Sequence, residues 1–539
     1  MLMFKALHAR YGARCFLLPL LICATVLLDA HSIGQEFIWD DQFFIAENQF
    51  LRSVASLPKL FITSITEGAG GQPTNFYRPL QAVSHLLDVQ LFGLNPVWHH
   101  ATNIALHALM GALFFLLLCR LLKEKENKWI PYAAFGAVAL WMLHPLQNFA
   151  AGYLSGRGDT LVGIFTAAAA LTWPKRRWLA GVYCALAVLS KESGILAPLF
   201  VVLVDFAERR LPLKSIMSPW KYLPIAVPAA FYVALRLTAL NFSNTLNFYN
   251  QANVLTENYS FRVFTFLTVF AKGLALIFWP VDLHHERSWF VYGSFDSPLV
   301  ITGAALLLGL VGIAIYAWPR ARLLSVGIIW FLLAQAPTSN LIALINALIY
   351  DHWFLLPSLG FMLAAGWLLN RALQRFAFSA VLGAWALCLL PLVVLSWGQL
   401  GAWQTARAQY EHILSYEPRS SKIMNNLGMI YAQEGEPERA QEIYRRSLEL
   451  SETPEGRNNL GNLYLIAGKF QEAERELTRA LELAPSLYQA STNLGRLKLR
   501  QNNCGEAEAH FRAALRRFPD PAAAQGLELT RECFAAIRK

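Results

Sequence analysis

Two adjacent carboxylates, Asp40 and Asp41, stand among aromatic residues in the stretch FIWDDQFF, residues 37–44. A carboxylate pair in apolar surroundings can accept a proton as a general base, share a proton or hold a divalent cation. The competing interpretation is an amphipathic segment at a membrane surface, where the acidic groups are solvated and the rings anchor at the interface. The residue types permit both interpretations, so the position of the pair relative to the membrane decides between them.

Further polar and ionisable residues occur in short segments between apolar stretches. Charges at membrane depth are costly, so they mark either a functional site or an ion pair. Arginine and lysine suit an anionic phosphate, while histidine and carboxylates can orient or transfer protons. The residues that we select from these segments are Arg78, His99, His144, Arg157, Asp159, Lys191 and Glu192, with His284–Arg287 and Asp351–Trp353 later in the chain.

Each of these residues also has a purely structural interpretation. Lys191 and Glu192 can pair with each other, and His107 can be a hydrogen-bonded core histidine. Arg157 and Asp159 can hold a loop together. A common location on one face of the membrane favours a shared cavity over several unrelated structural roles.

The elements that position these residues are predicted to be membrane helices. Of 539 residues, 55% are hydrophobic and 15% charged, and the mean hydropathy is +0.36, which is too apolar for an ordinary soluble protein. A span needs about 20 apolar residues to cross a hydrocarbon core of ~30 Å. We predict eleven spans, near 15–29, 98–119, 130–149, 160–174, 178–189, 194–206, 219–240, 298–318, 322–337, 353–370 and 377–399.

The charge and the cysteines exclude two other classes. The formal net charge is +10, and residues before 401 hold 27 basic against 18 acidic side chains, clustered in short loops. This pattern is typical of cytoplasmic membrane loops, so it disfavours nucleic-acid binding. The seven cysteines show no CxxC or Cys/His spacing, so the sequence predicts neither a metal site nor a disulfide framework.

The basic clusters set the orientation, because positively charged short loops stay in the cytoplasm. All six clusters can be cytoplasmic only if the segment 262–280 does not cross, so we predict a re-entrant or interfacial helix there, interrupted at Lys272 and Gly273. The N-terminal apolar segment lacks a small-x-small cleavage pattern and is predicted to remain as the first helix. The first outer loop, 30–96, and the last 139 residues are then extracytoplasmic. The clusters are Lys5 to Arg14, Arg120 to Lys128, Lys175 to Arg177, Arg209 to Lys214, Arg320 with Arg322, and Arg371 with Arg375.

The chain after residue 402 repeats with a period near 34 residues. Three Asn-Leu-Gly triplets, at 426–428, 459–461 and 493–495, are in register, as are Ala440, Ala473 and Ala507. Small residues at these positions let two helices pack closely, as in a tetratricopeptide (TPR) array. We predict about three full repeats with flanking half-repeats, forming an α-solenoid that binds a protein and carries no chemistry.

The order of short motifs along the chain resembles a known family. They are Trp39-Asp40-Asp41, Tyr77-Arg78-Pro79-Leu80, Asn95-Pro96 with Trp98-His99, His144-Pro145, Gly156-Arg157 with Asp159, Ser190-Lys191-Glu192, Ser339-Asn340-Leu341 and Leu356-Pro357-Ser358-Leu359-Gly360. Together with the repeats, this order resembles the TMTC-type transmembrane and tetratricopeptide O-mannosyltransferases. Each motif is short, while the ordered set covers nearly the whole chain.

The resemblance implies an all-α membrane domain of GT-C type over residues 1–401 and a TPR α-solenoid over 402–539. It implies that sugar passes from a polyprenyl-phosphate donor to an extracytoplasmic acceptor, with an essential Asp in the first outer loop. That position is Asp40 or Asp41, one of which is expected to act as the base for an inverting transfer to Ser or Thr of a protein docked on the TPR array. Arg78, Arg157 and Lys191 are expected to bind the donor phosphate, and His99, His144, Asp159 and Glu192 to orient sugar or base.

Some alternatives stay open. No cofactor is certain, although a divalent cation on Asp40 or Asp41 is possible. The segment before the Leu356–Gly360 motif departs from the family's Ala-Glu-Arg-type triplet, which puts the family's late acid–base pair in doubt here. The other functional classes are a non-catalytic membrane-anchored scaffold, a transferase of preassembled oligosaccharide or of lipid-linked glycan, and a transporter. We expect a bacterial inner membrane with a periplasmic site, the alternative being the lumen of the endoplasmic reticulum.

Overall fold

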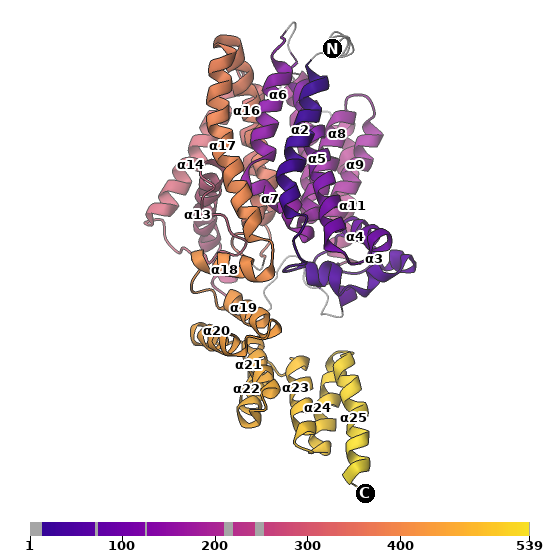
Figure 1. Ribbon diagram of the computed structural model, residues 1–539. Helices are drawn as coiled ribbons and strands as arrows, with labels where there is room; N and C mark the ends of the chain where they lie inside the picture. The colour runs from indigo at the N-terminus through magenta and orange to yellow at the C-terminus, as the bar shows by residue number, and fades with distance from the viewer. Residues whose placement is uncertain are drawn as a thin grey trace. The chain divides into compact units, whose positions relative to one another are not determined.

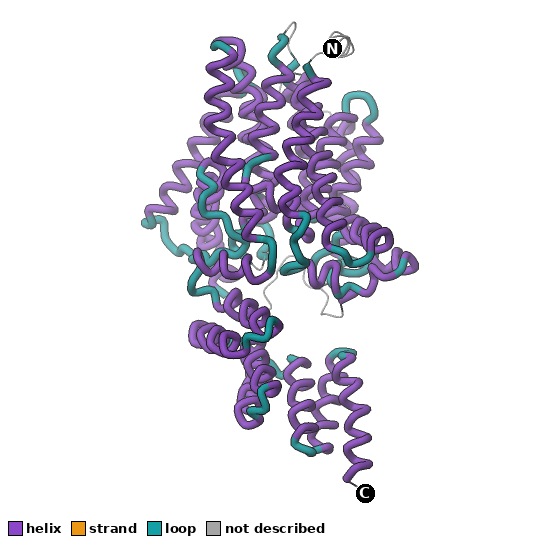
Figure 2. The backbone as a smooth tube through the Cα atoms, viewed as in Figure 1, coloured by secondary structure: helices purple, strands orange, loops and turns teal. Residues whose placement is uncertain are grey.

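The structure is a computed structural model that describes residues 13–69, 74–123, 127–209, 219–242, 253–345 and 347–537 of the chain. These residues form helices joined by loops and include no β-strand (Figure 1), as the tube in Figure 2 also shows. The predicted all-α fold class is confirmed. The chain divides into two compact units, Met1–Gln404 and Thr405–Lys539, close to the predicted boundary after residue 401.

The first unit is a bundle of apolar helices whose long axes run side by side in Figure 1. The helices form because their apolar runs bury against one another, and a cluster of buried residues from α2 to α17 makes the common core. Their bounds are α2 Arg14–Asp29, α5 Pro96–Leu121, α6 Ile130–Met142, α8 Arg157–Thr172, α9 Arg177–Ser190, α10 Ala197–Arg209, α11 Leu223–Leu237, α13 Tyr259–Phe278, α14 Pro298–Ala317, α15 Arg322–Ala334, α16 Leu355–Arg375 and α17 Phe378–Ala402.

Six helices of the described residues are long and apolar enough to cross a membrane, which makes the chain an integral membrane protein by length and composition. They are Arg14–Ser32, α5, α13, α14, Asp351–Arg375 and α17. Several other predicted spans are shorter apolar helices, such as α6 and α9. The number of eleven spans therefore stays a prediction, and the basic residues Lys5, Arg10 and Lys214 that supported its orientation lie outside the described residues.

Helix α13 differs from the sequence expectation in one respect. It runs without a break through Lys272 and Gly273, where an interruption was predicted. Position 273 requires glycine because the ring of Phe354 packs against the helix backbone at this point. A Cβ on residue 273 would stand only 2.0 Å from Phe354 Cε1. Lys272 reaches out of the helix to an ion pair with Asp282. The interruption is thus wrong, while the path of this helix relative to a membrane stays a prediction.

Two glycines bring α15 and α16 into close contact. A Cβ on Gly360 would stand 2.2 Å from the carbonyl oxygen of Gly327, and one on Gly327 would stand 2.4 Å from that of Gly360. Only glycine allows two helix backbones to approach in this way. The last glycine of the Leu356–Gly360 motif therefore has a packing role.

The first outer loop folds on its own small core instead of remaining extended. It contains the helices α3 Leu57–Leu60 and α4 Pro79–Phe92, and Figure 1 shows both at the end of the bundle away from the N-terminus. Gly93 at φ +67° ends α4 and turns the chain into α5. The loop's buried apolar side chains, from Phe44 to Val89, pack on Leu154 of the loop before α8. This core fixes the Asp40–Asp41 segment against residues more than 100 positions later in the chain.

The second unit consists of eight helices from residue 406 onward among the described residues, arranged as antiparallel pairs (Figure 1). The pairs α19–α20, α21–α22 and α23–α24 are flanked by α18 and α25. The Asn-Leu-Gly glycines lie where the two helices of a pair touch: a Cβ on Gly461 would stand 2.7 Å from Leu477 Cγ. The bounds are α18 Ala406–Tyr416, α19 Ser421–Gln433, α20 Pro437–Leu450, α21 Pro454–Ile466, α22 Phe470–Leu483, α23 Tyr488–Arg500, α24 Cys504–Arg517 and α25 Pro521–Ile537.

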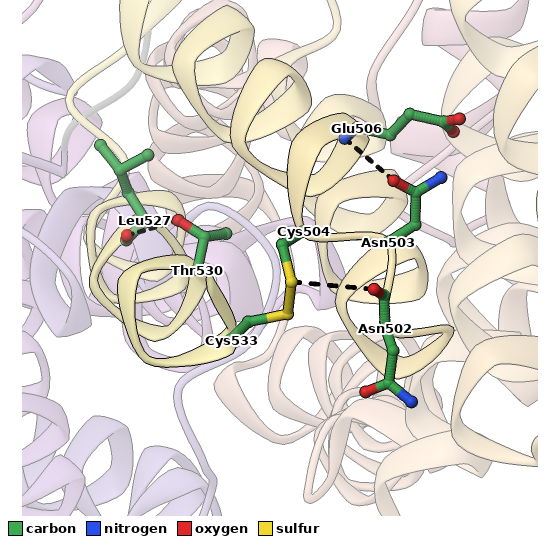
Figure 3. The surroundings of a disulfide bond; sticks show 7 residues. All are labelled: Asn502, Asn503, Cys504, Glu506, Leu527, Thr530 and Cys533. Atoms are coloured by element: carbon green, nitrogen blue, oxygen red, sulfur yellow. Dashed lines mark hydrogen bonds between the residues drawn. A yellow bond between two sulfur atoms is a disulfide. The ribbon is translucent and has the colours of Figure 1, made fainter. Parts of the chain in front are cut away.

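A disulfide joins the last two helices of this unit. Cys504 at the start of α24 pairs with Cys533 in α25, with their Cα atoms 5.9 Å apart (Figure 3). The prediction that the cysteines form no disulfide is therefore wrong for this pair. The spacing gave no CxxC signal because the partners meet only when α24 and α25 fold into a hairpin. Cys15, Cys23, Cys119, Cys184 and Cys388 are free.

Candidate active site

The backbone around the Asp40–Asp41 pair is irregular. Trp39 has φ +55°, in the left-handed region that a bulky residue rarely adopts, and a π-helical turn, Gln42–Ala46, follows directly. A strained residue of this kind costs on the order of 1–3 kcal/mol and persists where the surroundings hold it in place. The strain turns the Trp39 ring onto His285, with the ring centroids 4.7 Å apart.

Asp41 is fully buried and its oxygens are occupied by donors from the chain. The backbone N–H and the hydroxyl of Ser155 donate to Oδ1 at 2.8 and 2.6 Å, and the N–H of Ile38 donates to Oδ2 at 3.3 Å. Burial raises the pKa of Asp41 to about 7, although the hydrogen bonds from Ser155 and Ile38 favour the charged form. Asp41 therefore ties the first outer loop to the loop before α8.

Asp40 is partly exposed and differs from its neighbour in environment. The hydroxyl of Tyr153 donates to Asp40 Oδ2 at 2.8 Å. Burial, followed by the charges of Asp40 and Asp41, raises the pKa of Tyr153 well above its ordinary value. Tyr153 consequently stays protonated and acts as a hydrogen-bond donor to Asp40.

Aromatic and imidazole rings form a wall beside Asp40. Tyr153 contacts His285 at 4.9 Å between centroids, and His285 stacks on His352 at 5.4 Å. Trp403 lies edge-on to His285 at 5.9 Å. Tyr350 stacks on His352, and its pKa is raised by burial and then by the nearby charges of Glu286 and Asp40. Planar groups of this kind suit a sugar ring.

The cations predicted to bind phosphate occupy two different places. Arg78, at the start of α4, pairs with Glu192 at 2.9 Å, and Lys191 pairs with Asp159 at 2.6 Å. Asp159 also acts electrostatically on Arg78, so the four residues form one charge-balanced group. Both cations retain some exposure, 11% for the Arg78 side chain and 13% for that of Lys191. Arg78 acts on the pKa of Tyr153, which places this group next to Asp40.

Arg157, in contrast, lies in a separate buried cluster. Its side chain is fully buried, pairs with Asp88 at 2.7 Å and donates to the carbonyl of His99 at 3.0 Å. His99 bonds through Nε2 to the carbonyl of Gly93 at 3.1 Å. His144 uses both ring nitrogens on the backbone, at Ile277 and Leu146. Arg157, His99 and His144 are thus occupied by structural contacts, and the sugar- or base-orienting role of Asp159 and Glu192 stays a prediction.

Two separate later segments of the chain supply an Asp–Arg ion pair. Arg287 bonds to both oxygens of Asp351, with Nη2 to Oδ2 at 2.9 Å, and the N–H of His284 donates to Oδ2 at 2.9 Å. The arginine lies 64 positions before the acid in the sequence. An Asp–Arg pair is therefore present in the fold although the sequence has no Ala-Glu-Arg-type triplet at this position.

An open apolar groove of about 540 Å³ runs along α13 and α14. Its lining is aromatic and aliphatic, and Lys272 is its one charged residue among those that line it. Lys272 pairs with Asp282, which also pairs with Arg287 of the Asp351 pair. A chain of ion pairs therefore connects the groove to the loop that carries His285. The lining includes Thr268, Phe278, Trp279, Trp289, Leu306 and Phe361.

Two residues that shape this site, Tyr153 and Ser155, were not selected from the sequence. They stood in a polar segment that had been noted for Arg157, whereas His285 was selected as part of His284–Arg287 without an assigned role. Only the folded structure indicates their role, because Ser155 and Asp41 are 114 positions apart in the sequence and come into contact through folding. A tyrosine or serine in a loop has no pattern of its own that indicates such a contact.

Comparison with known proteins supports the interpretation of both units. Tetratricopeptide repeat models match residues 419–486, 458–520 and 492–528. The protein O-mannosyl-transferase F38B6.6 of Caenorhabditis elegans is 24% identical over 80% of this chain and 62% of its own length. Mouse protein O-mannosyl-transferase TMTC3 is 23% identical over 77% of this chain and 49% of its own length. The chain thus spans about half to three-fifths of the length of these two curated relatives.

Solved structures add no further argument. The APC/C hetero-tetramer Cut9–Hcn1 aligns over 84% of this chain and 92% of its own, with 14% identity and a TM-score of 0.25. The yeast Tom70 structure covers 81% of this chain and 96% of its own, with 14% identity and a TM-score of 0.24. Scores at this level do not support a common arrangement of the whole chain.

The fold and the site define an integral membrane protein that joins an all-α bundle, with a carboxylate–cation site at one end, to a TPR α-solenoid. More particularly, the chain is similar to the TMTC family of protein O-mannosyl-transferases, the family that its motif order resembles.

Proposed function

We propose that this protein is a glycosyltransferase that moves a hexosyl group, such as mannose, from a polyprenyl-phosphate donor to a Ser or Thr hydroxyl of an extracytoplasmic protein. The TMTC relatives are named protein O-mannosyl-transferases, which supports both the sugar and the acceptor class. The observation that carries the proposal is the division of labour in the acidic pair. Asp41 is buried under three hydrogen bonds, whereas Asp40 is partly exposed and oriented by Tyr153.

In this reaction, the acceptor oxygen forms a bond to the anomeric carbon while the bond from that carbon to the phosphate oxygen breaks. Asp40 accepts the proton of the acceptor hydroxyl, and the polyprenyl phosphate leaves with the electron pair. Attack from the face opposite the phosphate inverts the anomeric configuration. Tyr153 holds Asp40 in place and does not itself titrate, because its pKa is raised.

The departing phosphate needs cations, and Arg78 and Lys191 are the two that we assign. Each is paired with a carboxylate, so the phosphate would take the place of Glu192 or Asp159 in an existing ion pair. The apolar groove along α13 and α14, with Lys272 at its polar end, supports a lipid-borne donor because a polyprenyl chain matches its lining. We do not assign a metal to the Asp40–Asp41 pair, since Asp41 is already satisfied by protein donors.

We infer that the TPR unit recruits the acceptor protein, because helical repeats present a surface for peptides and contribute no chemistry. The disulfide between Cys504 and Cys533 supports an oxidising compartment for this unit, since disulfides persist outside the cytosol. A periplasm fits this condition, as does the lumen of the endoplasmic reticulum. We propose the bacterial inner membrane, with the site and the TPR unit in the periplasm.

The test is a transfer assay with purified full-length protein in detergent or nanodiscs, supplied with polyprenyl-phosphate mannose and a Ser/Thr-rich acceptor. We expect Asp40→Asn to lower transfer by about 10²–10⁴-fold, the usual contribution of a positioned general base. Asp41→Asn is the matched control, and its loss should be less than tenfold per folded molecule.

Three other outcomes would each contradict the proposal. Full activity in both variants would remove the acidic pair from the mechanism. Transfer only from oligosaccharide donors, or only to lipid-linked glycan, would change the substrate class. Absence of any transfer, with acceptor protein still bound to the TPR unit, would favour the non-catalytic scaffold.

A further inference from the structure

A second cluster of chemically competent side chains lies beside the proposed active site but apart from Asp40. It consists of His85 and Asp88, one turn apart on α4, and His99 near the start of α5. All three side chains are buried, with exposures of 0% for both histidines and 4% for Asp88. One ligand atom from each lies within 4.8 Å of the other two. The helical hairpin of α4 and α5, closed at Gly93, brings them together.

His85 is the member that most requires an explanation. Neither ring nitrogen has a hydrogen-bond partner in the part of the chain that the structure describes. An unsatisfied buried polar group costs about 1–3 kcal/mol, and His85 carries two such atoms. An imidazole nitrogen is a common metal ligand, so a bound ion would satisfy one of them.

His99 is oriented as a metal-binding histidine would be. Its Nε2 bonds to the carbonyl of Gly93 at 3.1 Å, so Nε2 carries the hydrogen and Nδ1 carries a lone pair. That Nδ1 lies 3.6 Å from Asp88 Oδ2, which is too far for a hydrogen bond. Two electron-rich atoms facing each other in a buried space favour a cation between them. A backbone carbonyl that fixes the tautomer is the usual outer contact of a metal-bound histidine.

Asp88 is held in place from two sides. The hydroxyl of Thr102 donates to Oδ1 at 2.9 Å, and Nη1 of Arg157 lies 2.7 Å from Oδ2. The positive charge of Arg157 repels a second cation at the Asp88 carboxylate, but other hydrogen bonds also hold its guanidinium in place. Nε donates to Asn103 and Nη2 to the carbonyl of His99, so Arg157 keeps its place while Asp88 shares Oδ2 with a metal.

We propose that His85, Asp88 and His99 bind a divalent transition-metal ion of the Zn²⁺ class. Two imidazoles and one carboxylate are a common ligand set for zinc, with a water molecule in the fourth position. Zinc bonds of about 2.0–2.2 Å place neighbouring ligands about 3.4 Å apart, so the three side chains must draw together on binding. The site joins α4 to α5, and through α4 it fixes the position of Arg78. Its role is structural, because its ligands tie the two helices of the hairpin to each other.

The experiment measures metal binding directly and does not depend on sugar transfer. Tag-free full-length protein, purified in detergent, is stripped with a chelator and then titrated with Zn²⁺ or Co²⁺, with metal content read by elemental analysis. We expect about one equivalent per chain, and Co²⁺ should give the visible absorption of tetrahedral nitrogen and oxygen ligation. His85→Ala and His99→Ala should each weaken binding by at least tenfold.

Two further variants separate ligation from folding. His100→Ala removes the adjacent buried histidine, which bonds to the carbonyl of Ala151 instead, and should keep full stoichiometry. His85→Asp retains a ligand, so it should bind Co²⁺ with a changed spectrum.

The proposal is overturned if stripped wild-type protein, still folded, takes up less than a tenth of an equivalent. It is also overturned if the His85→Ala and His99→Ala variants keep their metal. Failure of the transfer assay in metal-loaded wild type would count against the proposed function alone.

Discussion

The hydrogen bond from Tyr153 to Asp40 is the contact at residue scale that most directly affects chemistry. A donor to a carboxylate stabilises its charged form, so the tyrosine should keep Asp40 ionised and fixed in direction. We expect Tyr153→Phe to lower kcat/KM by about tenfold, the effect of one hydrogen bond to a charged group. The acidic limb of the pH–rate profile should also move upward, because the charged form of the base loses a donor, and a purely structural role would not cause this.

Tyr222→Phe is the matched control, since Tyr222 donates to Asp205 at 3.0 Å in a part of the bundle that contributes no residue to the site. An unchanged acidic limb in Tyr153→Phe, or an equal shift in Tyr222→Phe, would show that the Tyr153 bond does not tune the base.

The buried Asp41 leads to a second residue-scale prediction, on stability. Its pKa is raised from 3.8 to about 7, chiefly by burial, so the folded state holds a proton that the unfolded state releases. The folded state gains stability from this proton, on the order of 4 kcal/mol in total. The gain is fully present below about pH 4 and is lost as the pH rises through 7. The asparagine in Asp41→Asn does not titrate, and its NH₂ group faces the N–H of Ile38 without being able to accept its hydrogen bond. The folded state is therefore destabilised by about 1–3 kcal/mol at every pH.

The measurement is the unfolding midpoint of wild type and Asp41→Asn in detergent from pH 5 to pH 8. We expect the advantage of the wild type to shrink as the pH rises. An advantage that grows with pH would mean that Asp41 is charged throughout and that the bonds from Ser155 outweigh burial.

The sequence indicated the acidic pair but could not separate its members. Both aspartates have the same local sequence context, and only the fold brings Ser155 to one and Tyr153 to the other. The same limit applies to Arg157, because Asp88, which pairs with it, lies on another helix. Residue type shows which chemistry is available, whereas burial and partners assign it.

At the scale of elements, helix packing in the TPR unit depends on its glycines. Gly461 of α21 faces α22, where a Cβ would stand 2.7 Å from Leu477 Cγ and 3.2 Å from the Leu477 backbone nitrogen. Gly461→Ala should therefore separate the two helices at a cost of about 1–3 kcal/mol. Hydrogen exchange of the full-length protein should show faster exchange in α21 and α22.

Gly505→Ala in α24 is the control, since open space surrounds the position and φ there is not positive. Alanine should be neutral or stabilise α24 by about 0.5–1 kcal/mol through its higher helix propensity. Equal exchange in both variants would mean that the Asn-Leu-Gly glycines have no packing role.

These elements differed in how far the sequence predicted them. The repeats carry a regular period, so their helices and close contacts followed from Gly461 and its counterparts in register. The first outer loop carries no period, and its irregular turn at Trp39 depends on contacts with His285. The interruption predicted in α13 failed because Gly273 was interpreted as a helix breaker, whereas it provides room for the ring of Phe354.

For the whole molecule, the sequence predicted the two units and their order, because hydropathy changes sharply near residue 402. It did not predict the disulfide, whose cysteines are 29 positions apart and meet only through the α24–α25 hairpin. This disulfide gives physical support to an extracytoplasmic repeat unit that the loop charges alone had suggested. From both observations we predict that the TPR unit lies on the same side of the membrane as Asp40.

Cysteine labelling in intact cells tests this arrangement. In a background without the five free cysteines, Gln42→Cys and Glu438→Cys should both react with a membrane-impermeant maleimide, since both positions are exposed. Arg176→Cys, in a loop predicted to be cytoplasmic, should react only after the membrane is opened. If residue 42 reacts and residue 438 does not, α13 crosses the membrane and the number of crossings between them is odd. The acceptor could then not dock on the repeats while its hydroxyl reaches Asp40, so the proposed recruitment would fail together with the topology.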